Sequence, residues 1–254
     1  MEKSPYELIK STDESLWREG LNALLIDHSD RACEAVISVL SDKAWHKREA
    51  AAKILNEWGE GVTLYIQNRL NESSHDEFYW LLNVLGHIGG EQSFATIRKY
   101  LNHSDSEIKS YAIRALTHHR ALENARPLYP LLNDQNWAVR KLVFEQLLSF
   151  DQLIIDDLRK IILAPSQGAQ HTVIALFVKI GKDGVLDELG KIYQNGNFQM
   201  RYAIISALGE LGTPTAVDMI IASLADSSWA IRKAAGEQLV KLGSRVFDKL
   251  TAAF

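Results

Sequence analysis

One short sequence motif occurs three times in this chain at a constant interval. The segments DKAWHKREA, DQNWAVRKL and DSSWAIRKA begin at Asp42, Asp134 and Asp226, so each copy follows the previous one by 92 residues (134 − 42 and 226 − 134). A catalytic motif rarely needs three copies, because one cleft uses one set of reacting groups. Copies at a fixed interval are instead typical of architectures in which similar units stack on one another.

The interval divides further into units of 30 or 31 residues. In each unit an anchor residue is followed four positions later by a small or apolar residue, and seven and eight positions later by a second, mostly apolar pair. The anchors are Leu16, Lys47, Glu77, Ile108, Val139, Ala169, Met200 and Ile231, of which Lys47 and Glu77 depart from the apolar rule. Apolar residues that recur at spacings of three and four predict a helix in every unit.

A second amphipathic segment precedes each of the later anchored helices, as in RACEAVISVL and VLDELGKIY, so each unit is predicted to be a helical hairpin. Five of the anchored helices end near a glycine that could form a left-handed cap, namely Gly59, Gly89, Gly181, Gly212 and Gly243. One hairpin of about 30 residues cannot bury its apolar face alone. The sequence therefore predicts an all-α fold, a single right-handed α-solenoid of about eight hairpins over residues 1–254 with atypical terminal units.

Composition points to a soluble, globular protein. The 28 Lys and Arg residues face 32 Asp and Glu residues, which gives a formal net charge of −4. No apolar run approaches the roughly 18 residues of a membrane span, and the N-terminal segment MEKSPYELIKST lacks the apolar stretch of a secretory signal. Cys33 is the only cysteine, which excludes an intramolecular disulfide and a thiolate metal cage. We expect a cytoplasmic protein without a membrane role.

The wording DxxWAVRKxxxxxL, together with MRYAIISALGELGTPTAVDMIIASL, resembles the HEAT-like repeat family, specifically its short bacterial form first described in phycobilisome lyases. The resemblance covers essentially the whole chain and implies an α-solenoid. It raises a phycobilin lyase or isomerase, which would hold an open-chain tetrapyrrole or its carrier protein, as an enzymatic alternative.

The repeated charged residues have a structural interpretation. Asp42, Asp134 and Asp226, with Asp105 less regularly placed, lie where the anchored helices begin and can cap their backbone N–H groups. A basic residue follows the anchor in five units, and these are Arg48, Lys109, Arg140, Arg201 and Arg232. A helical wheel turns them toward the neighbouring unit, where they could bridge the aspartate turn of one unit to carbonyls or carboxylates of the next. The resemblance implies the same ladder.

Trp45, Trp137 and Trp229 recur at one position near the turn. We expect each indole to cover the seam between helices, with an exposed binding row as the alternative.

The solvent-facing arc of the anchored helices predicts a partner-binding surface on a concave face. In most units this arc carries ordinary polar residues, but the third and fourth units present aromatic, histidine and arginine side chains in adjacent rows. Such residues are favoured at protein interfaces. The predicted surface comprises Tyr79, Trp80, Asn83, His87, Tyr111, Arg114, His118, Lys141, Glu145 and Tyr202. Packing of Tyr79 and Trp80 into gaps of an irregular third unit is the alternative.

Catalytic motifs are missing from the sequence. None of the eight histidines is followed by Glu, unlike the repeated His-Glu pairs that hold iron in deoxyhypusine hydroxylases, and HExxH, a Walker loop and a nucleophile elbow are absent too. His87 and His118 occupy equivalent points of neighbouring helices and could meet, as a hydrogen-bonded surface pair. We therefore predict no catalytic, cofactor-binding or metal-binding residues.

The function predicted is a non-catalytic protein-interaction scaffold that binds a helix or peptide of another protein in its groove. Nucleic acid is the less favoured alternative, since the arc mixes Lys53, Arg114 and Lys141 with Glu49 and Glu145 and so lacks a basic stripe. Self-association through apolar end units, including the C-terminal SRVFDKLTAAF, is left open.

Overall fold

The computed structural model describes residues 3–163 and 170–246, and these residues form helices and connecting turns with no strand. The chain divides into two compact units, Met1–Pro127 and Leu128–Phe254, which are called unit 1 and unit 2 below. The predicted all-α fold of helical hairpins is confirmed. One domain spanning residues 1–254 stays a prediction.

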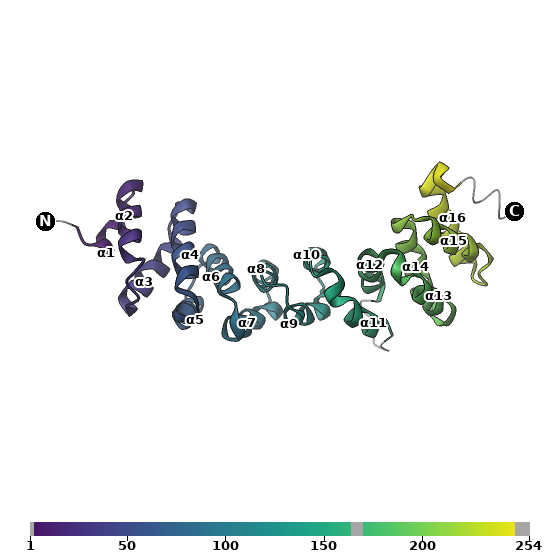
Figure 1. Cartoon of the computed structure of the whole chain (residues 1–254), viewed down its shortest axis with the longest axis horizontal. Coiled ribbons are helices and arrows are strands. Elements are labelled where there is room, and N and C mark those ends of the chain that lie inside the picture. Colours follow the sequence, from purple (N-terminus) through teal and green to yellow (C-terminus); the bar gives the residue numbers. More distant parts are fainter. Residues whose placement is uncertain (1–2, 164–169, 247–254) are drawn as a thin grey trace. The chain divides into compact units, whose positions relative to one another are not determined.

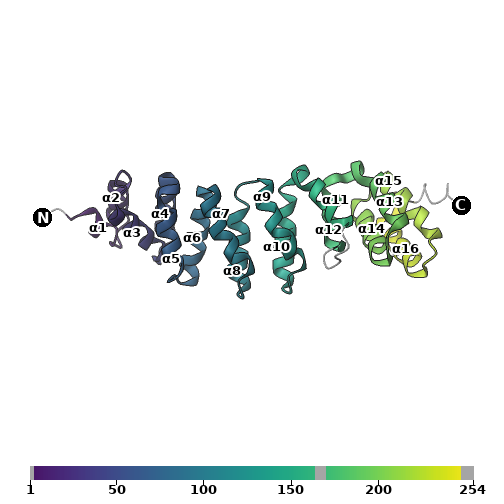
Figure 2. The same ribbon diagram turned by 90° about the horizontal axis from the view of Figure 1, so that it is seen from below.

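Unit 1 is built from helix pairs in which the anchored helix comes second. The pairs are α1 (Pro5–Leu8) with α2 (Glu14–Leu24), α3 (Asp30–Ser38) with α4 (Trp45–Trp58), α5 (Thr63–Leu70) with α6 (His75–Ile88), and α7 (Gly90–Lys99) with α8 (Ser106–Leu116), followed by α9 (Leu122–Ala125). Each second helix contacts the second helix of the next pair, and α3, α5 and α7 form a parallel row (Figure 1, Figure 2). Unit 1 is therefore a two-layered stack of hairpins.

Unit 2 repeats this arrangement after one irregular element. Its elements are η4 (Arg126–Asn133), α10 (Trp137–Leu148), α11 (Ile155–Leu163), α12 (Gln170–Gly181), α13 (Leu186–Asn195), α14 (Phe198–Leu211), α15 (Pro214–Ala222) and α16 (Trp229–Leu242). The predicted helix NARPLYPLL is instead α9 followed by the 3-10 helix η4. Pro127 and Pro130 explain the difference, because neither supplies the backbone N–H that an α-helix interior needs.

The position eight residues after the anchor forms the core of both units. Its occupants are Leu24, Leu55, Leu85, Leu116, Leu147, Phe177, Leu208 and Leu239, each at most 5% exposed. The two charged anchors are buried as well, and each is paired. Lys47 Nζ lies 2.7 Å from Asp42 Oδ2, and Glu77 accepts from Arg69 Nε at 2.7 Å. The buried charges of Lys47 and Glu77 are thus each compensated by an oppositely charged partner. The anchor Ala169 lies outside the described residues.

Four of the five predicted glycine caps have the expected positive φ, between 61° and 71°, at Gly59, Gly89, Gly212 and Gly243. The prediction is wrong at Gly181, which keeps a right-handed φ of −80° while Lys182 takes a φ of 47°. A Cβ at residue 181 would lie 2.2 Å from Val185 Cγ1. Glycine is needed there for close packing of the turn rather than for a left-handed conformation.

Three of the repeated aspartates, Asp42, Asp134 and Asp226, lie two residues before the N-cap residue of the helix that follows. Asp134 Oδ1 accepts the N–H of Asn136, and Asp226 Oδ1 accepts that of Ser228, in each case the residue just before the helix. Asp42 binds Ala44 N–H in the same way, whereas Asp105 is itself the N-cap of α8. The first three aspartates therefore shape the turn that leads into the helix.

Asp226 joins two neighbouring hairpins, as the predicted ladder requires. Its carboxylate accepts Arg201 Nη1 of α14 at 2.9 Å and the Tyr193 hydroxyl of α13, while Arg232 donates to the Asp226 carbonyl at 2.7 Å. Burial alone would raise the pKa of the carboxyl, but the bonds from Tyr193 and Ser228 and the charge of Arg201 hold this pKa below 3.8. The ionised carboxylate links three helices.

The other ladder arginines behave differently from Arg201. Arg140 Nη1 donates to the carbonyls of Asp134 and Gln135 at 2.7 and 3.0 Å, and Arg232 makes the matching bonds at Asp226 and Ser227. Both thus close the turn of their own hairpin. Arg48 makes no such bond, and its guanidinium lies over the Trp80 ring.

The expectation that the three repeated tryptophans cover seams is wrong. Trp45 is 62% exposed, and Trp137 and Trp229 are each 66% exposed. Each is the first residue of its helix, so its side chain projects from the end of the hairpin rather than into the seam. The three side chains are exposed, as the alternative requires, while binding of a partner by this row stays a prediction.

Among residues 3–163 and 170–246, no helix combines the length and the apolar character that a membrane crossing would require.

Replacing Asp226 with alanine should lower the free energy of unfolding by about 3 kcal/mol, because the change leaves Arg201 partly buried without its carboxylate. Urea unfolding followed by circular dichroism measures the effect. Glu237→Ala is the matched control, since its carboxylate meets Lys233 only as an exposed pair on α16 and should cost no more than about 0.5 kcal/mol. Equal losses in the two variants would contradict the role assigned to Asp226.

Candidate functional site

Aromatic rings and arginines gather on the second helices of unit 1. Tyr79 of α6 packs edge to face against Trp80 of the same helix and Tyr111 of α8, with ring centroids 5.5 and 5.3 Å apart. The Arg48 guanidinium of α4 lies 5.7 Å from the Trp80 ring centre. Arg114 projects, exposed, from α8. These five residues are called the aromatic surface below, and they draw on three consecutive second helices.

Burial within the aromatic surface is uneven. Tyr79 is 37% exposed, whereas Trp80 and Tyr111 are half-buried. Trp80, predicted to be freely exposed, is therefore partly packed, because Arg48 of the preceding hairpin lies against its ring. The sequence analysis assigned Arg48 to the ladder rather than to this surface. Its position directly after the anchor is the same as that of Arg140 and Arg232, so the sequence does not distinguish the two roles.

Tyr111 is held in place by an acidic neighbour. Its hydroxyl donates to Glu107 one turn earlier on α8, and burial together with this bond raises the pKa of Tyr111 to about 12. His75, at the start of α6, reaches the same region, with its Nε2 3.1 Å from Asp105 and its Nδ1 3.5 Å from Glu107. The carboxylates of Asp105 and Glu107 thus already have partners within unit 1.

A histidine cluster adjoins this surface at the ends of α6 and α8. The His87 and His118 rings lie 4.0 Å apart between centroids, and His118 Nε2 is 3.3 Å from the Asn83 amide nitrogen. His119 Nε2 is 3.2 Å from the His87 carbonyl oxygen. A Cβ at residue 86 would lie 2.5 Å from the Ala115 carbonyl oxygen, so only glycine permits this close approach of the two helices. The predicted meeting of His87 and His118 therefore occurs as a ring contact.

Protonation of His118 is disfavoured in the folded state. Part of His118 remains exposed, yet desolvation, with His87 and then His119 nearby, lowers its pKa from 6.5 to about 4. The unfolded chain takes up a proton as the pH falls below 6.5, while the folded chain does so only near 4. The stability that depends on neutral His118 is thus complete above pH 6.5 and is lost as the pH falls toward 4.

We expect thermal unfolding of the wild-type protein to shift downward between about pH 7 and about pH 5, through this group, by the equivalent of roughly 1 kcal/mol after allowance for solvent screening. His118→Gln, which keeps an amide opposite Asn83, should lose that part of the shift. The control is His171→Gln on α12, an exposed histidine of unit 2. A pH profile that is unchanged in the His118 variant would show that the cluster does not govern acid stability.

The remaining residues of the predicted surface belong to unit 2. Lys141 and Glu145 form an exposed ion pair along α10 at 3.8 Å. Tyr202 of α14 is exposed beside Phe198, with ring centroids 6.1 Å apart. Phe198 begins α14 at the position that Trp137 and Trp229 occupy in their helices, and the sequence analysis did not single it out. Its position two residues before the anchor Met200 could have identified it, because Trp137 and Trp229 precede their anchors by the same distance.

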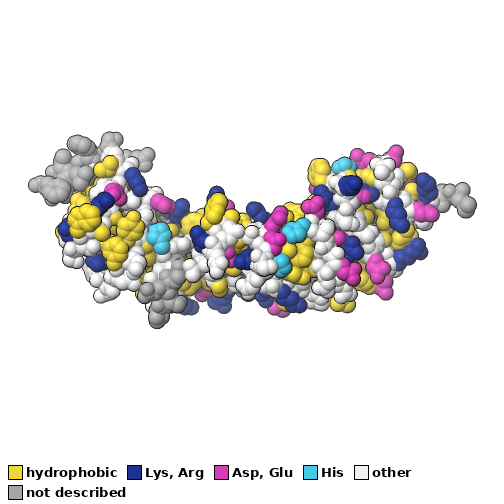
Figure 3. Space-filling view, turned by 180° about the vertical axis from the view of Figure 1, so that it is seen from behind, with side chains coloured by type: hydrophobic (Ala, Val, Ile, Leu, Met, Phe, Trp, Pro, Cys, Tyr) yellow, Lys and Arg dark blue, Asp and Glu magenta, His cyan; other side chains and the backbone are white. Residues whose placement is uncertain are grey.

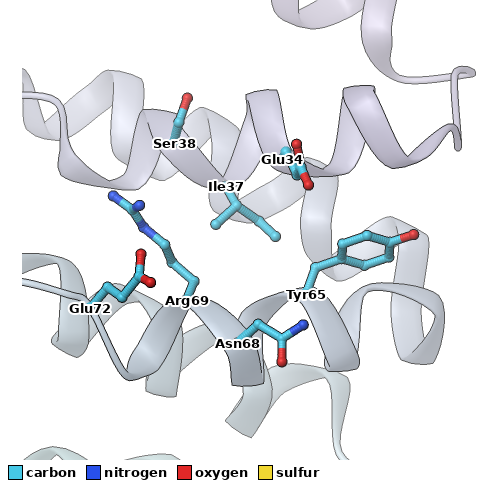
Figure 4. Close-up of a pocket in the computed structure, with 7 residues that line it drawn as sticks. All are labelled: Glu34, Ile37, Ser38, Tyr65, Asn68, Arg69 and Glu72. Carbon is cyan, nitrogen blue, oxygen red and sulfur yellow. The ribbon is translucent and has the colours of Figure 1, made fainter.

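A pocket of about 300 Å³ opens on the other layer of unit 1, between α3 and α5 (Figure 4). It is lined by Glu34, Ile37, Ser38, Tyr65, Asn68, Arg69 and Glu72. The Arg69 guanidinium binds the buried Glu77, and the Tyr65 hydroxyl donates to Asp30. Both side chains are thus used to join helices, and the sequence analysis did not predict this pocket.

Charged side chains of both signs are interspersed with apolar ones on the face of each unit seen in Figure 3. Within the described part of the chain, His, Cys, Asp and Glu side chains form no group of three or more that could hold a metal ion.

Comparison with known proteins gives a partial sequence match and similar solved structures. The family model for HEAT repeats matches residues 186–254. The sequence has no match among curated proteins.

Three solved structures are similar to nearly the whole chain. They are YibA of Escherichia coli (18% identity, 93% of this chain and 91% of that chain, TM-score 0.42), the complex of CpcE and CpcF of phycocyanin lyase from Nostoc sp. PCC7120 (16%, 100% and 93%, 0.34), and the archaeal HEAT-like repeats protein from Thermococcus onnurineus NA1 (15%, 95% and 97%, 0.33).

The stacked hairpins of both units define an all-α helical-repeat protein. HEAT repeats are matched in the C-terminal part of the chain, residues 186–254, and the helices before this part form hairpins of the same kind.

Proposed function

We propose that the protein is a non-catalytic interaction scaffold, in which unit 1 binds a helix or peptide of another protein on the aromatic surface. The observation that carries the proposal is the contact of Tyr79 with both Trp80 and Tyr111, which assembles rings from adjacent helices on one accessible face. Tryptophan, tyrosine and arginine supply most of the binding energy in many protein interfaces. A scaffold helix needs none of them on its solvent side.

The stacking of the hairpins supports this use of the surface. Helix α6 contacts α4 on one side and α8 on the other, so the backbone that carries Tyr79 and Trp80 is held from both sides. A prepositioned surface loses little conformational entropy when a partner binds. Lys141, Glu145 and Tyr202 are proposed as contact residues of unit 2 by itself.

A phycobilin-handling enzyme remains the second function considered, because the similar structures include a phycocyanin lyase complex. Nucleic acid binding is disfavoured, since Lys53 and Lys141 on the second helices are each paired with a glutamate, Glu49 and Glu145, whereas backbone binding needs a continuous basic stripe.

The proposal predicts that a Trp80→Ala/Arg114→Ala variant loses at least tenfold in affinity for its protein partner, or about 1.4 kcal/mol. Wild-type protein and variant are used to capture partners from a native extract, which are identified by mass spectrometry and then measured by titration. The absorbance of the captured material is recorded in the visible range.

The matched control is Leu64→Ala/Arg120→Ala, which also removes one exposed apolar and one exposed basic side chain of unit 1 away from the aromatic surface. Because Trp80 is half-buried, the melting temperature of each variant is measured alongside binding. Equal capture by wild type and the Trp80/Arg114 variant would refute the proposed surface, and a captured tetrapyrrole would favour the lyase alternative.

A further inference from the structure

Two arginines on the aromatic surface lack a carboxylate partner. In residues 3–163 and 170–246, no Asp or Glu oxygen lies within 4.0 Å of the guanidinium of Arg48 or of Arg114. Arg48 Nε is buried, and no acceptor in the described part of the chain binds it. The Trp80 ring, with its centre 5.7 Å from the Arg48 guanidinium, stabilises this cation.

Five other basic side chains of unit 1 are matched by acids. Arg18 pairs with Glu14, Lys53 with Glu49, and Arg98 with Glu91. The buried Lys47 and the half-buried Arg69 also meet carboxylates, Asp42 and Glu77. Arg48 and Arg114 differ from these five side chains. Arg48 lies over the Trp80 ring, and Arg114 lies about one turn after Tyr111 on α8.

Three acids near these rings are already bound. Glu107 accepts from Tyr111 and lies beside His75, and Asp105 caps α8 while also meeting His75. Glu49 on α4 is bound by Lys53 at 3.0 Å. None of the three makes an ion pair with Arg48 or Arg114, so both guanidinium groups are free to bind carboxylates of a partner. A planar guanidinium offers paired N–H donors to such a group.

We propose that the partner segment is acidic: aspartate or glutamate side chains bind Arg48 and Arg114, and an apolar or aromatic side chain between them rests on the Tyr79, Trp80 and Tyr111 rings. This inference rests on the proposed function and specifies the chemistry of the partner. Charge complementarity selects the acidic segment, because a basic segment would meet two guanidinium groups that no carboxylate of the described residues contacts.

The test uses three labelled peptides in which phenylalanine alternates with aspartate, asparagine or lysine, titrated against the full chain by fluorescence anisotropy. The aspartate peptide should bind at least tenfold more tightly than the asparagine peptide, and the lysine peptide most weakly. Added salt should reduce the aspartate preference. Arg48→Gln and Arg114→Gln should each remove most of it, whereas Arg120→Gln, an exposed arginine beyond α8, should leave it intact.

Each result separates the inference from the function it rests on. If the aspartate and asparagine peptides bind equally, and only Trp80→Ala weakens both, the surface binds peptides but acid recognition is refuted. Tighter binding of the lysine peptide, or no binding of any of the three, also overturns the acidic partner. Aspartate binding that survives Arg48→Gln and Arg114→Gln but disappears in a variant elsewhere would refute the acidic site and the proposed surface together.

Discussion

The structure depends on the burial of one large apolar side chain per hairpin by the hairpins beside it. Leu55 and Leu85 are fully buried although each lies on a helix with one face open to solvent. Burying a leucine contributes roughly 2 kcal/mol, and a two-helix hairpin has no third element to provide the cover. Neighbouring hairpins supply it, so every unit both needs its neighbours and stabilises them. Because this requirement uses only one side of each second helix, the opposite side is free to carry binding residues.

Polar interactions then fix the geometry of the stack. The Arg201–Asp226 contact and the buried Lys47–Asp42 and Arg69–Glu77 pairs each join elements that apolar packing alone would allow to slide. Close backbone approach does the same at Gly86, where α6 meets α8 without an intervening side chain. The aromatic surface lies on these fixed helices, and the His87–His118 contact joins the far ends of the same pair.

Periodicity was sufficient to predict which positions of each helix are buried. The buried leucines and four positive-φ glycines follow from a repeat of 30 or 31 residues, and so does the meeting of His87 with His118, which occupy equivalent positions of neighbouring helices. Contacts between positions that are not equivalent were harder to predict. Trp80 is partly covered by Arg48, a residue 32 positions earlier, and helical spacing contains no information about that side chain. The exposed indoles were mispredicted because a first-turn position can face either the seam or solvent, depending on the preceding turn.

The turn that begins with Asp134 is reproduced in detail at Asp226. In both turns the carboxylate binds the N–H two residues later, the arginine donates to two successive carbonyls, and the indole is 66% exposed. Such agreement across 92 residues shows that the two copies of the motif specify the same turn. In the copy at Asp42, Lys47 supplies the cation to the turn. The Arg48 guanidinium is therefore not used to close that turn, and it lies beside Trp80 instead.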